Sequence, residues 1–110
     1  MNLTAKLKKL RDGLKKLQDI KVYHYRREKM TTPFLVWQET GEGDAFYADN
    51  GKREQPIAGT AEYFTRTEYD ETVDKIQVAL GAICSSWSLL SVQYEEETGR
   101  IHYEWEWEMV

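Results

Sequence analysis

The sequence predicts a single α+β domain in which two helices cover one face of a mainly antiparallel sheet of about five to six strands. Two segments have apolar residues at helical spacing, and the last ten residues alternate between apolar and polar side chains. Strict alternation indicates a strand with one wet and one buried face, which is typical of antiparallel sheets. At 110 residues, the chain has room for one such domain, residues 1–110, with one core.

The N-terminal segment is predicted to be an amphipathic helix that begins after Asn2 and closes at Asp19. Five leucines follow one another at spacings of four, three, four and three residues, which places them on one stripe. These are Leu3, Leu7, Leu10, Leu14 and Leu17. Packing on the domain's own sheet is favoured over a coiled coil, because five leucines make too few heptads. The basic residues are expected on the wet side: Lys6, Lys8, Lys9, Arg11, Lys15 and Lys16.

Three strands and a long loop are expected next. Residues 22–25 and 34–37 are predicted strands that flank a polar loop. Residues 40–55 contain three glycines and the Asp49-Asn50-Gly51 turn signal, and are predicted to form a long hairpin or loop. Residues 57–67 carry β-branched and aromatic residues and form the next predicted strand.

A second helix is predicted at residues 68–83. Thr67 and Asp70 resemble a capping box. The apolar residues behind them recur at spacings of three, four and three: Val73, Ile76, Leu80 and Ile83.

The chain is expected to end in a β-hairpin with its turn at residues 96–99. Leu90, Val92 and Tyr94 alternate with polar residues before the turn. After it, the apolar positions are Ile101, Tyr103, Trp105, Trp107 and Met109. The alternate positions place Glu104, Glu106 and Glu108 on one side of the last strand, about 6 to 7 Å apart. A wet row that keeps a terminal strand soluble is favoured over a metal site, which would need ligands from a neighbouring strand.

The sequence indicates no catalytic, cofactor-binding or metal site, and a protein that is not an enzyme. Cys84 is the only cysteine, so neither an internal disulfide nor a thiolate zinc site is possible, and its thiol is expected to be inert. His24 and His102 lie on different predicted strands and are interpreted as neutral residues on a wet face. Phosphate-binding glycine motifs are absent.

The charges are unevenly distributed along the chain. Residues 1–29 carry ten basic and three acidic residues, a net charge of +7, and residues 30–110 carry −11. Complementary ends of this kind favour binding of one copy to the next. Two solvated faces, or nucleic-acid binding by the basic helix with Arg26 and Arg27, are the alternatives. No secretory signal and no run of about 20 apolar residues is present, so no membrane association is expected.

Four segments carry a resemblance to a known family. They are Val-Tyr-His-Tyr at 22–25, Pro-Phe-Leu-Val-Trp-Gln-Glu at 33–39, Ala-Glu-Tyr-Phe-Thr-Arg-Thr-Glu-Tyr-Asp at 61–70, and Tyr-Glu-Trp-Glu-Trp-Glu at 103–108. From about residue 20 to the end, the chain resembles a small protein encoded among the head-to-tail joining genes of long-tailed phages and prophages of Gram-positive bacteria. Such proteins are similar to the tail terminator or tail completion family.

This resemblance implies an α+β subunit that assembles as a ring, usually hexameric, at the head-facing end of the tail tube. The ring stops tube growth and docks the head connector. The implied location is the virion, after assembly in the host bacterial cytoplasm. The implied partners are further copies of the chain, the tail tube and the head connector, without specific nucleic acid.

Two sets of residues are candidates for assembly, because a closed ring needs one patch to meet a different patch on the next copy. The expected subunit contacts are Phe46, Tyr47, Glu42, Asp44, Lys8, Lys9 and Arg11. Phe46 and Tyr47 lie in a polar stretch where core burial is hard, although both rings could also tuck onto the sheet edge. Glu104, Glu106 and Glu108 are candidates for an acidic lumen that lets DNA pass, or for a wet face. The alternative function is a cytoplasmic dimeric module that binds protein or nucleic acid through the basic helix.

Overall fold

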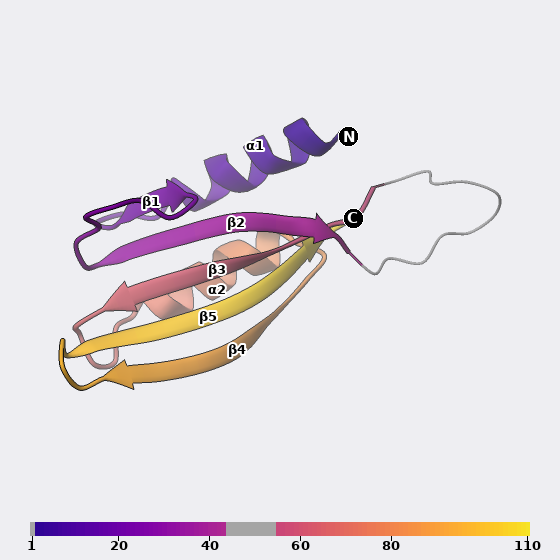
Figure 1. Ribbon diagram of the computed structural model, residues 1–110. Coiled ribbons are helices and arrows are strands. Elements are labelled where there is room, and N and C mark those ends of the chain that lie inside the picture. Colours follow the sequence, from indigo (N-terminus) through magenta and orange to yellow (C-terminus); the bar gives the residue numbers. More distant parts are fainter. Residues whose placement is uncertain (1, 44–54) are drawn as a thin grey trace.

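The computed structural model describes residues 2–43 and 55–110 and has two helices and five strands (Figure 1). In chain order these are α1 (Leu3–Leu14), β1 (Lys21–His24), β2 (Phe34–Glu42), β3 (Ile57–Thr65), α2 (Thr72–Ile83), β4 (Ser86–Glu95) and β5 (Arg100–Met109). The strands form one sheet in the order β1-β2-β3-β5-β4. β1 runs parallel to β2, and the other neighbouring strands are antiparallel. The predicted α+β class is confirmed.

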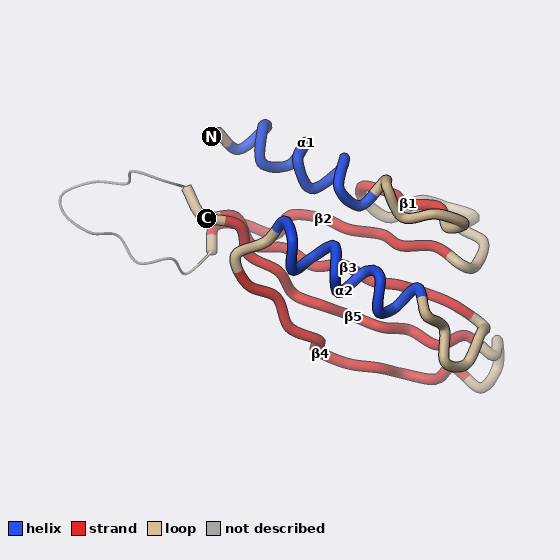
Figure 2. The backbone as a smooth tube through the Cα atoms, turned by 180° about the vertical axis from the view of Figure 1, so that it is seen from behind, coloured by secondary structure: helices blue, strands red, loops and turns tan. Residues whose placement is uncertain are grey.

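Both helices lie on the same face of the sheet, and the core lies between them and the strands (Figure 2). The largest buried side chains are Trp37 of β2 with Trp105 and Trp107 of β5. Gly59 leaves room for the Trp107 ring, since a Cβ at this position would lie 2.2 Å from the indole. The buried residues of the helices pack into the same cluster: Leu10, Leu14, Ile76 and Leu80.

The first helix begins as predicted but ends earlier. The Asn2 side chain accepts a hydrogen bond from the Ala5 backbone amide at 2.8 Å and caps α1. The helix ends at Leu14, five residues before Asp19, whose φ of 66° lies in the left-handed region and cannot continue a right-handed helix. Lys6 was expected on the wet side, which is wrong: only 2% of it is exposed, and its Nζ donates to the Gln55 carbonyl oxygen.

The second helix begins at Thr72, four residues later than predicted, because Asp70 and not Thr67 supports its first turn. Asp70 Oδ1 accepts from the Thr72 backbone amide at 2.9 Å. Its Oδ2 accepts from the Tyr63 hydroxyl at 2.6 Å and from the Thr65 hydroxyl at 2.7 Å. This one carboxylate therefore joins the start of α2 to the end of β3.

The strands match the predictions with shifted ends. β2 extends to Glu42, so the first residues of the predicted 40–55 loop belong to a strand, with a bulge between Glu39 and Gly41. The other residues of that loop up to 54 lie outside the described residues, except Gly43. β3 ends at Thr65, two residues before the predicted end. β4 begins at Ser86, four residues before the predicted alternation, and the C-terminal hairpin with β5 is confirmed.

Candidate interaction surfaces

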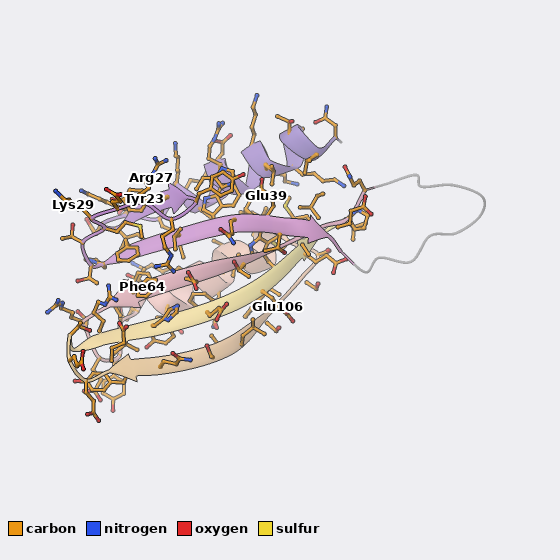
Figure 3. The ribbon with its side chains drawn as sticks, viewed as in Figure 1. Tyr23, Arg27, Lys29, Glu39, Phe64 and Glu106 are labelled. Carbon is orange, nitrogen blue, oxygen red and sulfur yellow. The ribbon has the colours of Figure 1, made fainter. Side chains whose placement is uncertain are left out.

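The face of the sheet that the helices leave uncovered carries the predicted row of glutamates. Glu104, Glu106 and Glu108 alternate along β5 with Trp105 and Trp107, whose side chains are buried on the helix side. Figure 3 shows Glu106 on the open side of β5. Within residues 2–43 and 55–110, no basic side chain lies within ion-pair distance of these three carboxylates. The row is therefore a concentrated negative surface.

The strand register adds a fourth carboxylate to this surface. Glu62 of β3 lies directly opposite Glu104 of β5, on the same face. Two like charges facing each other across an antiparallel pair repel. Arg26 moderates the repulsion, because its guanidinium contacts Glu62 Oε2 at 2.6 Å.

A hollow of about 460 Å³ with a mixed polar and apolar lining lies beside the glutamate row. Glu106 and Glu108 contribute to its lining, and Ser88 Oγ donates to Glu106 Oε1 at 3.1 Å. The hollow is open to solvent on a flat sheet. Among the described residues, no group of three or more His, Cys, Asp or Glu side chains is placed to hold a metal ion.

The other end of the open face holds a stack of rings covered by arginines. Phe64 stacks between Phe34 and His102, with ring centroids 4.7 and 4.2 Å away. The guanidinium carbons of Arg26 and Arg100 lie 5.5 and 5.1 Å from the Phe64 centroid. Both arginines thus make cation–π contacts on the same ring.

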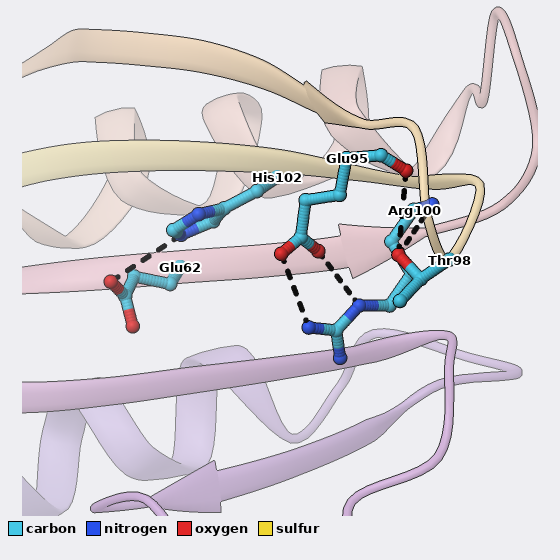
Figure 4. Close-up of polar contacts among 5 residues, drawn as sticks. All are labelled: Glu62, Glu95, Thr98, Arg100 and His102. Carbon is cyan, nitrogen blue, oxygen red and sulfur yellow. Dashed lines mark hydrogen bonds and ion pairs between the residues drawn. The ribbon is translucent and has the colours of Figure 1, made fainter.

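These arginines are also held by carboxylates, as Figure 4 shows for Arg100. Arg100 Nε donates to Glu95 Oε1 at 2.8 Å, and Arg26 contacts Glu62. The contact with Arg100 keeps the pKa of the Glu95 carboxyl below its ordinary value. Arg26, which the nucleic-acid alternative needs for phosphate contacts, is therefore already engaged within the domain.

Both histidines are partly covered by aromatic side chains, so neither is the freely solvated residue that the sequence interpretation expected. His102 is stacked on Phe64, and its Nε2 is buried, 3.4 Å from Glu62 Oε1 and without a hydrogen-bond partner among the described residues (Figure 4). His24 is stacked between Tyr25 and Trp37 with both centroids at 3.8 Å. β2, β3 and their side chains separate the strands that carry the two histidines.

Glu39 holds His24 and Tyr25 in place from β2. Its carboxylate oxygens pair with His24 Nε2 at 2.8 Å and accept from the Tyr25 hydroxyl at 2.7 Å. Partial burial would raise the pKa of Glu39, but these two hydrogen bonds outweigh it and lower the pKa. Tyr25 has a φ of 74°, so these contacts also stabilise an unfavourable backbone conformation.

Cys84 is buried after α2, as expected for an inert thiol. Burial raises the pKa of this thiol to about 12. A thiol at neutral pH is a poor nucleophile, because the thiolate is the reactive form. The residue packs as part of the core.

The solvent side of α1, with the two residues that follow it, forms a basic surface on the helix side of the sheet, which we call the α1 surface. Its exposed lysines are Lys8, Lys9, Lys15 and Lys16. Arg11, partly exposed, lies among them and pairs with Asp12 at 2.9 Å. Because Leu10 and Leu14 face the core, these charges point away from the sheet. The basic surface and the glutamate row thus lie on opposite sides of the molecule.

Of the remaining predicted contact residues, the structure describes only Glu42. Phe46, Tyr47 and Asp44 lie outside the described residues. Glu42 is exposed at the end of β2, and its carboxylate accepts from Gln55 Nε2 at 3.1 Å.

An apolar strip along β4 is the surface that the sequence interpretation missed. Alternation predicted that this strand has a buried face, yet its large apolar residues are substantially exposed: Trp87, Leu89, Leu90, Val92 and Tyr94. These side chains are exposed because β4 is the last strand of the described sheet and has only β5 as a neighbour. We call these five residues the β4 strip. Their high apolar content could have signalled a surface only if the strand order had been known.

No model of a protein family matches the sequence, and no curated protein is significantly similar to it. Neither helix described in the structure is long and apolar enough to span a bilayer.

Proposed function

We propose that the protein is a structural, non-enzymatic subunit that assembles head to tail into a ring and completes or terminates the tail of a long-tailed phage or prophage. The observation that supports self-assembly is the opposite charge of the two sides of the domain. The basic surface of α1 is on one side, and Glu104, Glu106 and Glu108 are on the other. The tail function rests on the sequence resemblance described above.

Opposite charges on opposite sides favour contacts between unlike patches. The α1 surface of one copy attracts the glutamate row of the next and repels a second α1 surface. A repeated contact between two different patches closes into a ring when the rotation between copies allows it. In this proposal the tail tube and head connector meet the rims of the ring, and the virion is where the protein acts.

In the proposed contact, the glutamate row binds the α1 surface of the next copy, whereas in the lumen interpretation the row lines the channel for DNA. A row that contacts α1 of the next copy is required for assembly. A row that lines the lumen is dispensable for assembly, and its neutralisation would slow DNA passage because fewer negative charges repel the phosphates. Replacing all three glutamates by Gln separates these roles, because only the first predicts loss of the ring.

Charge reversal gives the sharper test. We expect the K8E/K9E variant, in which two acidic side chains replace two basic ones on the α1 surface, and the E104K/E106K variant, in which two lysines replace two glutamates of the row, each to form no ring at low salt. An equimolar mixture should assemble, because every contact between alternating copies is again between opposite charges. Sedimentation velocity and electron microscopy measure the product, and K75E, on the exposed surface of α2, is the matched control.

The same samples test the alternative function. Titration with duplex DNA at several salt concentrations reports phosphate contacts through the slope of affinity against salt. A protein that never assembles and binds DNA with a steep slope would overturn the proposal in favour of a nucleic-acid-binding module. If each reversed variant alone forms no ring and their mixture does, the result supports the proposed head-to-tail contact.

A further inference from the structure

We propose that a second copy of this chain docks on the β4 edge, so that two five-stranded sheets join across a two-fold axis. Within residues 2–43 and 55–110, the outer edge of β4 is unpaired, because β4 is the terminal strand of the sheet and only β5 lies beside it. It is ten residues long and contains no Lys, Arg or Pro. Proteins usually protect such an edge with charges or proline, because its free amide and carbonyl groups pair readily with another strand.

The side chains on the helix side of β4 have a palindromic spacing. Register with β5 places Trp87 opposite Trp107 and Leu89 opposite Trp105. Beyond the irregularity at Leu90, it places Val92 opposite Tyr103 and Tyr94 opposite Ile101. All four residues of β4 therefore face the helix side, at intervals of two, three and two residues. The irregularity creates the central interval of three, and the series is symmetric about it.

This symmetry selects one antiparallel register between two copies. When Leu90 of one copy lies opposite Ser91 of the other, Trp87 faces Tyr94 and Leu89 faces Val92, twice over. Aromatic residues then pair with aromatic residues, and aliphatic with aliphatic, on one continuous surface. Such cross-strand pairs are the units that stabilise a sheet. A shift by one residue would move the apolar side chains of one copy to the opposite face.

Charge and exposure favour the same partner. The only charged residue of β4 is Glu95, which in this register lies opposite Ser86 of the second copy. The acidic turns at residues 96–97 then lie at opposite ends of the paired strands, so they do not repel. The exposed fractions rise from 36% for Trp87 to 51% for Val92 and 64% for Tyr94. Pairing would cover this apolar surface in both copies at once.

The other edge of the sheet is a poorer partner. β1 has four residues, Lys21–His24, against ten in β4. Docking β1 of one copy on β4 of another would leave more than half of the β4 edge unpaired. A second β4 is the one strand in the described chain that matches the edge in length and in apolar pattern.

This contact goes beyond the proposed ring, because it is isologous and apolar, whereas the ring contact is heterologous and electrostatic. The two therefore respond differently to salt. At about 1 M salt, where charges are screened beyond about 3 Å, the ring contact weakens and the β4 contact persists. Wild-type protein should then sediment as a dimer.

Cysteine cross-linking tests the register. In a C84A background, L89C/V92C should form a covalent dimer on oxidation at high salt, because each new cysteine faces its counterpart. The single variants L89C and V92C are matched controls that should not cross-link, since their equivalent positions are offset along the strands by about three residues, or about 10 Å. Equal cross-linking of single and double variants would overturn the register.

A charge placed on the strip tests the contact itself. V92K should convert the dimer to a monomer at high salt, while its circular dichroism spectrum and the melting of the monomer stay close to wild type, because Val92 is half exposed in the single chain. K75E, an exposed change on α2, should leave the dimer intact. A wild-type monomer at high salt, or a V92K dimer as stable as wild type, refutes the proposal without affecting the test of the ring.

Discussion

At the scale of single residues, two carboxylates on the open face of the sheet repel each other, and a substitution can remove this repulsion. Glu62 and Glu104 face each other across β3 and β5, and Arg26 contacts Glu62 only on one side. We expect E104Q to raise the free energy of unfolding by about 0.2–1 kcal/mol at low salt. Urea unfolding checks this value. E106Q is the control, because Glu106 faces Thr60 and should give a smaller gain; an equal gain would mean that general surface charge is responsible.

Asp70 makes stability depend on pH in the acid range. Burial would raise the pKa of its carboxyl, but the hydrogen bonds from Tyr63 and Thr65 outweigh this and lower it. A lowered pKa in the folded state means that the stabilisation is present above the unfolded value, near pH 4, and is lost as pH falls through the folded pKa.

We therefore expect the D70N variant to be less stable than wild type at neutral pH by about 1–3 kcal/mol. The difference should shrink as pH falls below about 4, because the wild-type carboxyl becomes neutral as well. Denaturant unfolding at a series of pH values measures both curves. Parallel curves down to the lowest pH would show that the Asp70 charge does not stabilise the fold.

At the scale of elements, α1 contacts α2 at Gly13, against the Ile83 side chain. A Cβ there would lie 2.0 Å from Ile83 Cδ1. Alanine normally stabilises a helix interior by up to about 1 kcal/mol over glycine. We expect G13A to lose this gain in the wild-type background and to recover it in the I83V background, where Cδ1 is absent. Thermal unfolding of the four proteins in this cycle measures the coupling. Equal effects in both backgrounds would contradict the close contact.

The sequence predicts which residues of a strand share a face, but it does not predict whether that face is covered by the rest of the fold. Alternation from Ile101 to Met109 correctly predicts which residues of β5 face the core, because a strand's faces follow from its own period of two. The same reasoning predicts a buried face for Val92 and Tyr94, which are exposed. Periodicity assigns residues to a common face, but only the strand order shows that β4 is an edge with little beside it.

Some of the candidate surfaces are likewise predicted from local spacing, and others depend on the fold. The glutamate row and the lysines of α1 are found from spacing alone. Lys6 is buried where it contacts Gln55, and His24 stacks on Trp37 of β2. Both partners are distant in sequence, so no local pattern predicts these contacts. Sequence reasoning thus finds the charged surfaces, and the fold is needed to find the apolar one.

At the scale of the whole molecule, the two kinds of contact surface that we propose point in different directions. The charged surfaces lie on its two sides, and the β4 strip lies along one edge of the sheet (Figures 1 and 3). One heterologous contact generates a ring, and one isologous contact generates a pair. They generate a double ring with dihedral symmetry when the β4 two-fold axis meets the ring axis at a right angle, and each copy then has one β4 partner and two ring neighbours.

The two proposed contacts predict four assembly states from two sets of substitutions. At low salt, wild type should form double rings, V92K single rings, K8E/K9E two-fold dimers, and the combined variant monomers. Each substitution removes one contact and leaves the other, because Val92 and the α1 lysines lie on separate elements and surfaces. Sedimentation velocity gives the masses, and electron microscopy distinguishes single from double rings. If K8E/K9E also abolished the dimer, or V92K also opened the ring, the contacts would not be independent, and one shared interface would replace the two-contact arrangement.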